Sequence, residues 1–187
     1  MCIRDSHTTG GFQGQVLLDG KEVHVTSPHD AMNKGIGMVH QEFMLLPGFT
    51  VTENIKLNRE ITHRNFFSRL MGKNLETLNM HKMSSDARKA LDSVGMSIDE
   101  YTRVEGMPVG YMQFVEIARE IDKTGMKLLV FDEPTAVLTP QEIDELMEIM
   151  RGLTREGKSI LFITHKLNEI MAVSDRVTVL RKGRYVG

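Results

Sequence analysis

The alternation of apolar and polar positions divides the chain into short strands, tight turns and amphipathic helices. Apolar-rich runs at residues 128–131 and 159–164 are typical of buried strands in a parallel sheet. A shorter run at residues 36–39 predicts a third strand. Asp19-Gly20 and Lys182-Gly183 lie between strand-like segments and predict tight turns. The pattern therefore predicts an α/β fold with a parallel-sheet core and an antiparallel β hairpin near the N-terminus.

Apolar residues at three- and four-residue spacing predict helices between these strands. Residues 52–94 are interpreted as mostly helical, and residues 110–121 as a second helical segment. Thr139-Pro140-Gln141-Glu142 is a capping box that begins a third helix, whose apolar face is Ile143, Leu146, Met147, Met150 and Leu153. Because the first two segments interrupt the series of strands, we expect an α-helical subdomain over about residues 49–122.

The composition is that of one ordinary globular domain. The 187 residues are 41% hydrophobic and 26% charged, with a formal net charge of −2. This balance gives no broad basic field, so we expect no nucleic-acid partner. The apolar runs are far shorter than the ~20 residues that cross a bilayer, so any membrane role would be peripheral. The single Cys2 excludes an internal disulfide framework.

Polar side chains follow each of the three predicted strands. Gln41 comes after the first, Asp132 and Glu133 after the second, and His165 after the third. The carboxyl ends of parallel strands meet at one sheet edge, where ligands of such folds bind. Asp132 could hold Mg²⁺, and Glu133 could orient or deprotonate a water that attacks a phosphate. A plain strand-to-turn junction would also explain Asp132 and Glu133, but the repeat of the arrangement at His165 favours a site.

A phosphate-loop pattern, GxxxxGK[ST], matches residues 152–159. A phosphate loop must follow a strand and open a helix, whereas this match follows a predicted helix and precedes a strand. We therefore interpret Gly157 as the residue that ends the helix. The chain contains no second match, so a nucleotide site would need a phosphate loop from upstream of Gly10.

The order of these features resembles the nucleotide-binding domain of ABC ATPases over about residues 14–187. The resemblance implies a P-loop NTPase-like fold with ATP and Mg²⁺ as cofactors. It makes Gln41 the Q-loop glutamine, which touches Mg²⁺ and the attacking water. Asp132 becomes the Walker B aspartate that holds Mg²⁺, and Glu133 becomes the catalytic glutamate. His165 is implied to be the switch histidine that contacts the γ-phosphate.

One branch of that family is similar to residues 35–44, 49–55 and 132–141: the ATP-binding subunits of importers of simple sugars and nucleosides. Its members carry two tandem nucleotide-binding domains. The resemblance implies that residues 10–187 are most of the first domain, truncated at both ends. Residues 1–9 are expected to be an artefactual or disordered leader. Without a phosphate loop, we expect the chain alone to be inactive.

The implied function is ATP hydrolysis that powers uptake of a sugar or nucleoside at the cytoplasmic face of the cell membrane. The implied partners are the second nucleotide-binding domain, the transmembrane permease subunits and, indirectly, a solute-binding protein. Apolar residues between 49 and 72 would form the subdomain's own core, which is the favoured interpretation of Phe66 and Phe67. Phe49 and Leu57 would border a groove for a permease helix.

One motif departs from the family pattern. Residues 107–111 align with the leucine-serine-glycine-glycine-glutamine signature, but Pro108 replaces the serine and offers neither a hydroxyl nor an N–H. Val109 and Gly110 remain as nucleotide contacts, with a helix N-terminus behind them. Because each signature serves the opposite domain's site, the departure affects the partner's site rather than the one with Glu133.

Two other functions stay open on the sequence. An ABC-family ATPase acting on ribosomes or DNA would need a basic linker or a long heptad coiled coil, and neither pattern occurs here. A non-hydrolysing regulatory ABC domain is the literal expectation for a chain without a phosphate loop.

Overall fold

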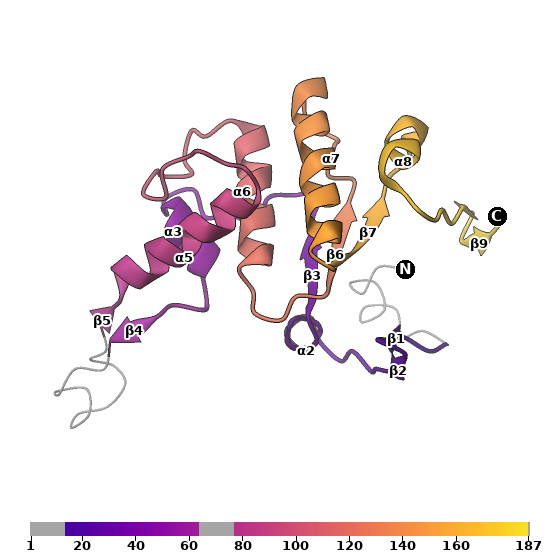
Figure 1. The fold of residues 1–187 in the computed structure, drawn as a ribbon, viewed down its shortest axis with the longest axis horizontal. Coiled ribbons are helices and arrows are strands. Elements are labelled where there is room, and N and C mark those ends of the chain that lie inside the picture. The colour runs from indigo at the N-terminus through magenta and orange to yellow at the C-terminus, as the bar shows by residue number, and fades with distance from the viewer. Residues whose placement is uncertain (1–13, 64–76, 187) are drawn as a thin grey trace.

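The computed structural model describes residues 14–63 and 77–186, and its centre is a three-stranded parallel sheet (Figure 1). The strands are β3 (Ile36–Val39), β6 (Leu128–Asp132) and β7 (Ser159–Ile163), in the order β3-β6-β7. The three central residues of the middle strand are buried, which agrees with its nearly continuous apolar sequence. The predicted parallel-sheet core is confirmed.

The strands are in register, so that their C-terminal ends lie together. Val39 pairs with Phe131, and Phe131 pairs in turn with Phe162. The next pair, Asp132 and Ile163, is the last of the ladder. The segments that follow the three strands therefore start from one edge of the sheet.

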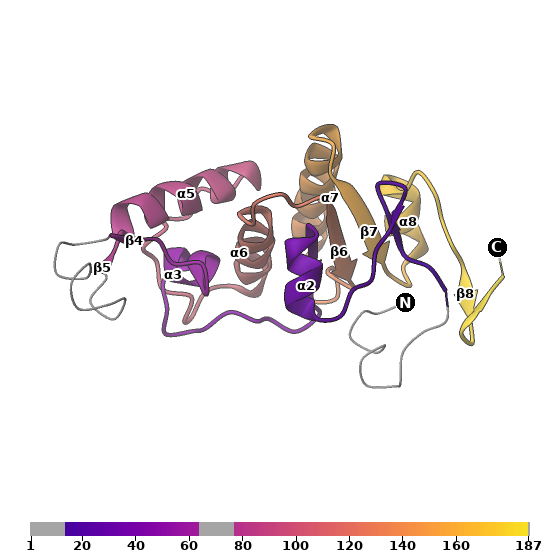
Figure 2. The same ribbon diagram turned by 90° about the horizontal axis from the view of Figure 1, so that it is seen from below.

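Helices cover both faces of this sheet. The short helix α2 (Pro28–Asn33) packs on one face through Ala31, against Ile36, Met38, Leu128, Val130 and Ile163. The opposite face meets α6 (Val109–Ile121) and α7 (Pro140–Arg155), and its core includes Val39, Leu129, Phe131, Phe114, Ile117, Leu146 and Met150. Figure 2 shows α2 on the opposite side of the sheet from α7. Alternate strand residues thus serve different helices, as the pleat requires.

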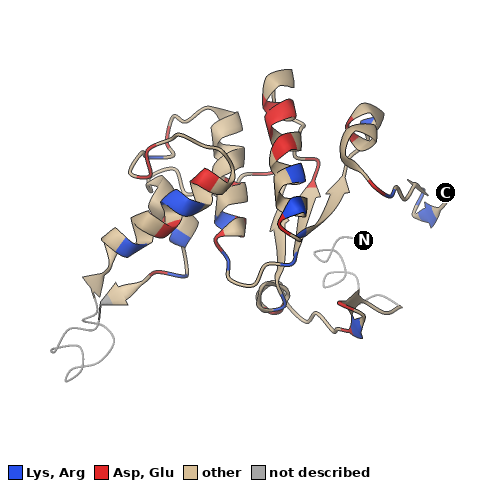
Figure 3. Cartoon of the chain, in the orientation of Figure 1, with Lys and Arg blue, Asp and Glu red and all other residues tan. Residues whose placement is uncertain are grey.

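The predicted capping box at the start of α7 is present. Thr139 accepts a hydrogen bond from the N–H of Glu142, and the Glu142 carboxylate accepts one from Thr139 N–H at 2.8 Å. Figure 3 shows acidic residues towards the start of α7 and basic residues towards its end. This distribution suits the helix dipole and stabilises both ends.

The end of α7 explains the phosphate-loop match. Gly157 has φ +82° and donates its N–H to Thr154 O at 2.9 Å. Lys158 N–H reaches back to Leu153 O at 3.1 Å. These two bonds form a Schellman motif, which ends a helix. The match therefore includes the last turn of a helix and cannot cradle a phosphate, as the sequence order predicted.

A group of helices packs beside the sheet. It consists of α3 (Val51–Lys56), α5 (Met80–Ser93) and α6, which share one buried core with the sheet: Val51, Ile55, Ala87, Ala90, Leu91, Val115 and Ala118. At one end of α3, Lys56 forms a buried ion pair with Asp122 at 2.7 Å and a second, partly exposed one with Asp86 at 3.4 Å. The contacts tie all three helices together.

The expectation of mostly helical structure over residues 52–94 is wrong at residues 57–63 and 77–79, while residues 64–76 lie outside the described part of the chain. After α3, Asn58 has φ +62°, a left-handed conformation that ends the helix. Short antiparallel strands β4 (Thr62–His63) and β5 (Thr77–Leu78) then pair with each other before α5 begins. The β-branched threonines favour this extended pairing.

Both predicted tight turns are present. Strand β1 (Leu17–Leu18) pairs with β2 (Lys21–Glu22), and β8 (Leu180–Arg181) pairs with β9 (Arg184–Tyr185). The turn residues all have positive φ: Asp19 +53°, Gly20 +74°, Lys182 +50° and Gly183 +74°. Positive φ at both central positions is the geometry that matches the twist of two-residue hairpins.

Some expectations lie outside the described residues, namely the leader at residues 1–9 and the core role of Phe66 and Phe67. Over residues 14–63 and 77–186, no helix has both the length and the apolar character needed to span a membrane.

Candidate functional site

The loop after β6 is shaped by an unusual backbone conformation at Glu133. This residue has φ +47°, which is uncommon for any residue other than glycine. Its N–H donates to Ile163 O at 2.9 Å, so the contact with β7 continues one residue beyond the paired strands. Such conformations persist where surrounding contacts determine them, and they gather at functional sites.

The structure brings Glu133 and His165 together. Glu133 Oε1 lies 3.0 Å from His165 Nδ1, although the two residues come from different strand ends. The side chains are 35% and 74% exposed, so solvent and a ligand can reach them. A carboxylate oriented by an imidazole can position a water and take its proton.

Asp132 and Gln41 lie at the same sheet edge but form no hydrogen bond or ion pair with Glu133 or His165. Asp132 is the last residue of β6, and Gln41 is an exposed residue two positions after β3. Among the described residues, neither side chain makes a hydrogen bond or ion pair, so the oxygens of both are available. Mg²⁺ takes oxygen ligands, commonly one or two carboxylates together with water and substrate phosphates. These two oxygen donors fit Mg²⁺. Residues 14–63 and 77–186 contain no group of three or more His, Cys, Asp or Glu side chains placed to hold a metal ion.

The start of α6 places Val109 and Gly110 on the side of the molecule where the strands end (Figure 1). Val109 is exposed, whereas Gly110 is buried against α7. A Cβ at Gly110 would overlap the Glu142 carboxylate that caps α7. Close approach of the two helices is therefore one reason for glycine here, whether or not this position also meets a nucleotide.

Sequence reasoning missed a buried polar face on α6. The sequence analysis assigned no role to Gln113, Glu116 and Glu120, yet all three side chains are buried. Their spacing of three and four residues was the available signal. Glu116 accepts a hydrogen bond from Met44 N–H, and Arg119 Nη1 donates to Met44 O at 2.9 Å.

These contacts hold the segment that carries Gln41 at both ends. Glu120 Oε2 accepts from Met38 N–H at 3.3 Å, before Gln41, while Glu116 binds Met44 after it. Burial raises the pKa of the Glu116 carboxyl, and the Met44 N–H and the Arg119 guanidinium partly oppose that shift.

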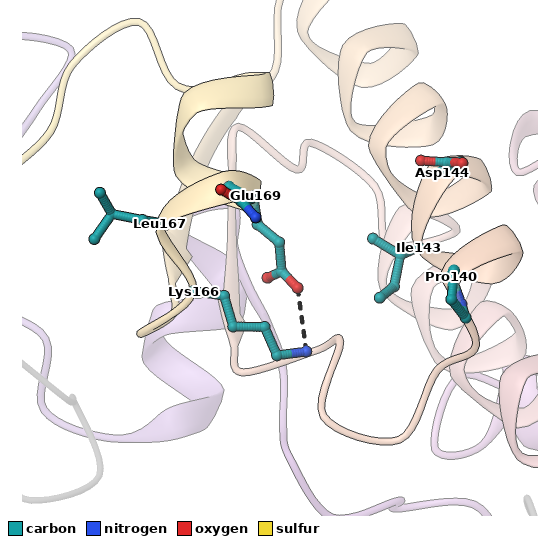
Figure 4. A pocket seen from close by; sticks show the side chains of 7 residues that line it. Pro140, Ile143, Asp144, Lys166, Leu167 and Glu169 are labelled. Carbon is teal, nitrogen blue, oxygen red and sulfur yellow. Dashed lines mark ion pairs between the residues drawn. The ribbon is translucent and has the colours of Figure 1, made fainter.

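A second polar cluster, formed by Thr135, Thr164, Lys166 and Glu169, was also missed. Glu169 is buried in the first turn of α8 (Leu167–Val173), and its carboxylate accepts hydrogen bonds from both threonine hydroxyls. Lys166 and Glu169 point towards each other beside a hollow of about 510 Å³, across from Pro140 and Ile143 of α7 (Figure 4). The sequence places these residues near Glu133 and His165 but does not show that they meet.

Comparison with known families gives one match over most of the chain. The ABC transporter family model matches residues 6–136. That range contains Gln41, the start of α6, and Asp132 with Glu133.

Curated relatives match nearly the whole chain. The nucleoside import ATP-binding protein NupA of Lactococcus lactis subsp. cremoris (strain MG1363) is 46% identical over 174 residues, which is 93% of this chain and 32% of the relative. The xylose import ATP-binding protein XylG of Shigella flexneri serotype 5b (strain 8401) is 39% identical over 178 residues, 95% of this chain and 32% of the relative. The chain thus spans about a third of the length of these relatives.

Solved structures share the fold. A nucleotide-free ATP-binding cassette from an ABC transporter aligns with TM-score 0.76 and 22% identity, covering 95% of this chain and 69% of its own. The cbiO1 protein of Clostridium perfringens, part of the ABC transporter complex cbiONQ, aligns with TM-score 0.70 and 24% identity, covering 93% and 64%.

Proposed function

This chain belongs to the ABC transporter family, and we propose on that basis that it is the ATP-binding and ATP-hydrolysing part of an importer. The observation that carries the proposal is the contact between Glu133 and His165. Glu133 directly follows Asp132, the last residue of β6. The solute class rests on the relatives, which are named as nucleoside and xylose import proteins. A simple sugar or a nucleoside is therefore the proposed cargo.

Each residue at the sheet edge has a proposed task. The unpaired Asp132 carboxylate and the Gln41 carboxamide oxygen would hold Mg²⁺, which neutralises phosphate charge when it is bound. Glu133 would orient the attacking water and accept its proton. The 3.0 Å contact from His165 Nδ1 supports this task, because it restrains one carboxylate oxygen and leaves the other free.

The proposed partners follow from exposed parts of the chain. The start of α6, with Pro108, Val109 and Gly110, would face the nucleotide of a second nucleotide-binding domain. Exposed Phe49, beside the Gln41 segment, would meet a permease subunit. The proposed place of action is the cytoplasmic face of the cell membrane, with a solute-binding protein as an indirect partner and no nucleic acid.

The substitution Glu133→Gln tests the catalytic proposal in the full-length protein with its permease. Glutamine keeps the shape and the hydrogen bonding but cannot accept a proton, so single-turnover hydrolysis should fall by about 10²–10⁴-fold. Equilibrium ATP binding should persist, because Asp132 would hold the Mg²⁺. The control is Glu148→Gln, which removes an exposed carboxylate from α7.

The alternatives give different results in the same assay. Near wild-type hydrolysis by Glu133→Gln would show that Glu133 is not the base. A wild-type complex that binds ATP but does not turn it over would instead favour the regulatory domain.

A further inference from the structure

We propose that Glu169 is a positioning residue for the pair Glu133 and His165. The inference rests on the proposed function of that pair and adds a residue to it. Glu169 makes no hydrogen bond or ion pair with Glu133 or His165 themselves. It connects the loop after β6 with the loop after β7, so that the 3.0 Å contact between Glu133 and His165 is maintained.

One carboxylate oxygen makes the connection. Glu169 Oε2 accepts hydrogen bonds from Thr135 Oγ1 at 2.9 Å and from Thr164 Oγ1 at 3.1 Å. Thr135 lies two residues after Glu133, and Thr164 immediately precedes His165. The buried side chain is therefore bonded to both loops next to the residues that they present.

Lys166 completes the cluster. Its Nζ lies 3.2 Å from Glu169 Oε1 and donates to Thr135 O at 3.1 Å. The Lys166 N–H also donates to Thr164 Oγ1 at 3.1 Å. The Glu169 charge is thus paired and hydrogen-bonded, which is the condition under which a carboxylate is stable in the interior.

The exposed pair needs such support. The His165 side chain is 74% exposed and the Glu133 side chain 35%, so burial alone does not fix either of them. In contrast, Thr135 and Glu169 are 2% and 8% exposed. The buried hydrogen bonds of Glu169 therefore adjoin the exposed groups along both loops. Reacting groups lose rate steeply when they are displaced by about 1 Å.

The test combines two measurements on Glu169→Ala, Glu169→Gln and the control Glu148→Ala. The control removes an acid from an exposed i,i+3 ion pair with Arg151. The first measurement is the ¹⁵N NMR spectrum of the His165 ring in the chain of residues 1–187, with His165→Ala for assignment. The second is kcat and KM for ATP in the full-length transporter, with a melting curve for each variant.

The proposal expects Glu169→Ala to move the His165 ring resonances. It also expects kcat to fall by about ten- to a hundredfold with KM for ATP unchanged. Glu169→Gln should recover part of kcat, because its amide oxygen still accepts from the threonines. The control should match the wild type in both measurements.

Two results would overturn the positioning role of Glu169. One is that the His165 resonances do not move in Glu169→Ala. The other is that kcat falls by no more than the fraction of folded protein that the melting curves show to be lost. If the wild-type transporter did not hydrolyse ATP, the proposed function would fail. Shifted His165 resonances would then still support the positioning role.

Discussion

Glu116 brings a carboxylate into the buried face of α6, where the Met44 N–H donates to it. Burial raises the pKa of this carboxyl, and the contacts with Met44 and Arg119 oppose the shift only in part. The folded chain therefore binds this proton more tightly than the unfolded chain does. The free energy of unfolding falls as the pH rises through the raised pKa.

We predict that Glu116→Gln removes this dependence. Glutamine can still accept from Met44 N–H but does not ionise. The variant should gain stability relative to the wild type as the pH rises from the ordinary value of 4.5 through the raised pKa. Above that window the difference should stay constant. Denaturant unfolding at a series of pH values measures the difference in the free energy of unfolding between Glu116→Gln and the wild type. Glu148→Gln is the control for loss of a surface carboxylate. A stability difference that does not change with pH would contradict the prediction.

At the scale of elements, α6 and α7 meet where both helices begin. Gly110 of α6 packs against the carboxylate of Glu142, which also caps α7 through the Thr139 N–H and hydroxyl. The Glu142 side chain is thus held by its capping bonds and cannot move aside freely. The glycine allows two helix starts to share one small space.

We expect Gly110→Ala to destabilise the chain by about 1–2 kcal/mol, because the new methyl group displaces Glu142 from its capping bonds. In a Glu142→Ala background the same change should be neutral or stabilising. Alanine favours a helix over glycine by up to about 1 kcal/mol, and the overlap is then gone. A double-mutant cycle by urea unfolding measures the coupling. Equal costs in both backgrounds would refute the packing explanation.

At the scale of the whole molecule, the core is continuous from the sheet to the helices. Val39 of β3, Leu45 of the following segment and Val51 of α3 belong to the same buried cluster. The segment between β3 and α3 is exposed on its other side at Met44 and Phe49. Gln41 therefore lies on a connection between the sheet and the helices, next to an exposed apolar surface.

Cysteine crosslinking in the restored complex tests whether this surface meets the permease. In a Cys2→Ser background, cysteines at Phe49 and Leu57 should crosslink to a permease subunit. The control is Leu78→Cys, an exposed apolar position on β5 at the far end of the helical group (Figure 1). Crosslinks confined to the second nucleotide-binding domain, or equal crosslinking from Leu78, would count against the proposed surface.

The chain of residues 1–187 should bind Mg-ATP only weakly and should not hydrolyse it. Its single phosphate-loop match spans the end of α7, so the backbone N–H groups that would cradle a phosphate are not arranged there. Titration of labelled Mg-ATP into the purified chain measures the affinity, with Lys158→Ala as the variant. Tight binding that depends on Lys158 would mean that the match is a true phosphate loop.

Local patterns in the sequence were sufficient for the three parallel strands, the tight turns and the capping box of α7, but not for β4 and β5. Each of these depends on residues close together in the chain, such as Asp19 with Gly20 or Thr139 with Glu142. The same reasoning placed Gln41, Asp132, Glu133 and His165 after strands, because parallel strands must end at one edge.

Only the tertiary structure decided which of these side chains touch and what lies beneath them. The contact between Glu133 and His165 depends on the register of β6 with β7 and on a positive φ at Glu133. Glu169 bonds Thr135 and Glu116 bonds Met44, and both of these partners are distant in sequence. A buried carboxylate is stable only where hydrogen-bond donors converge on it, and that convergence is a property of the packed molecule.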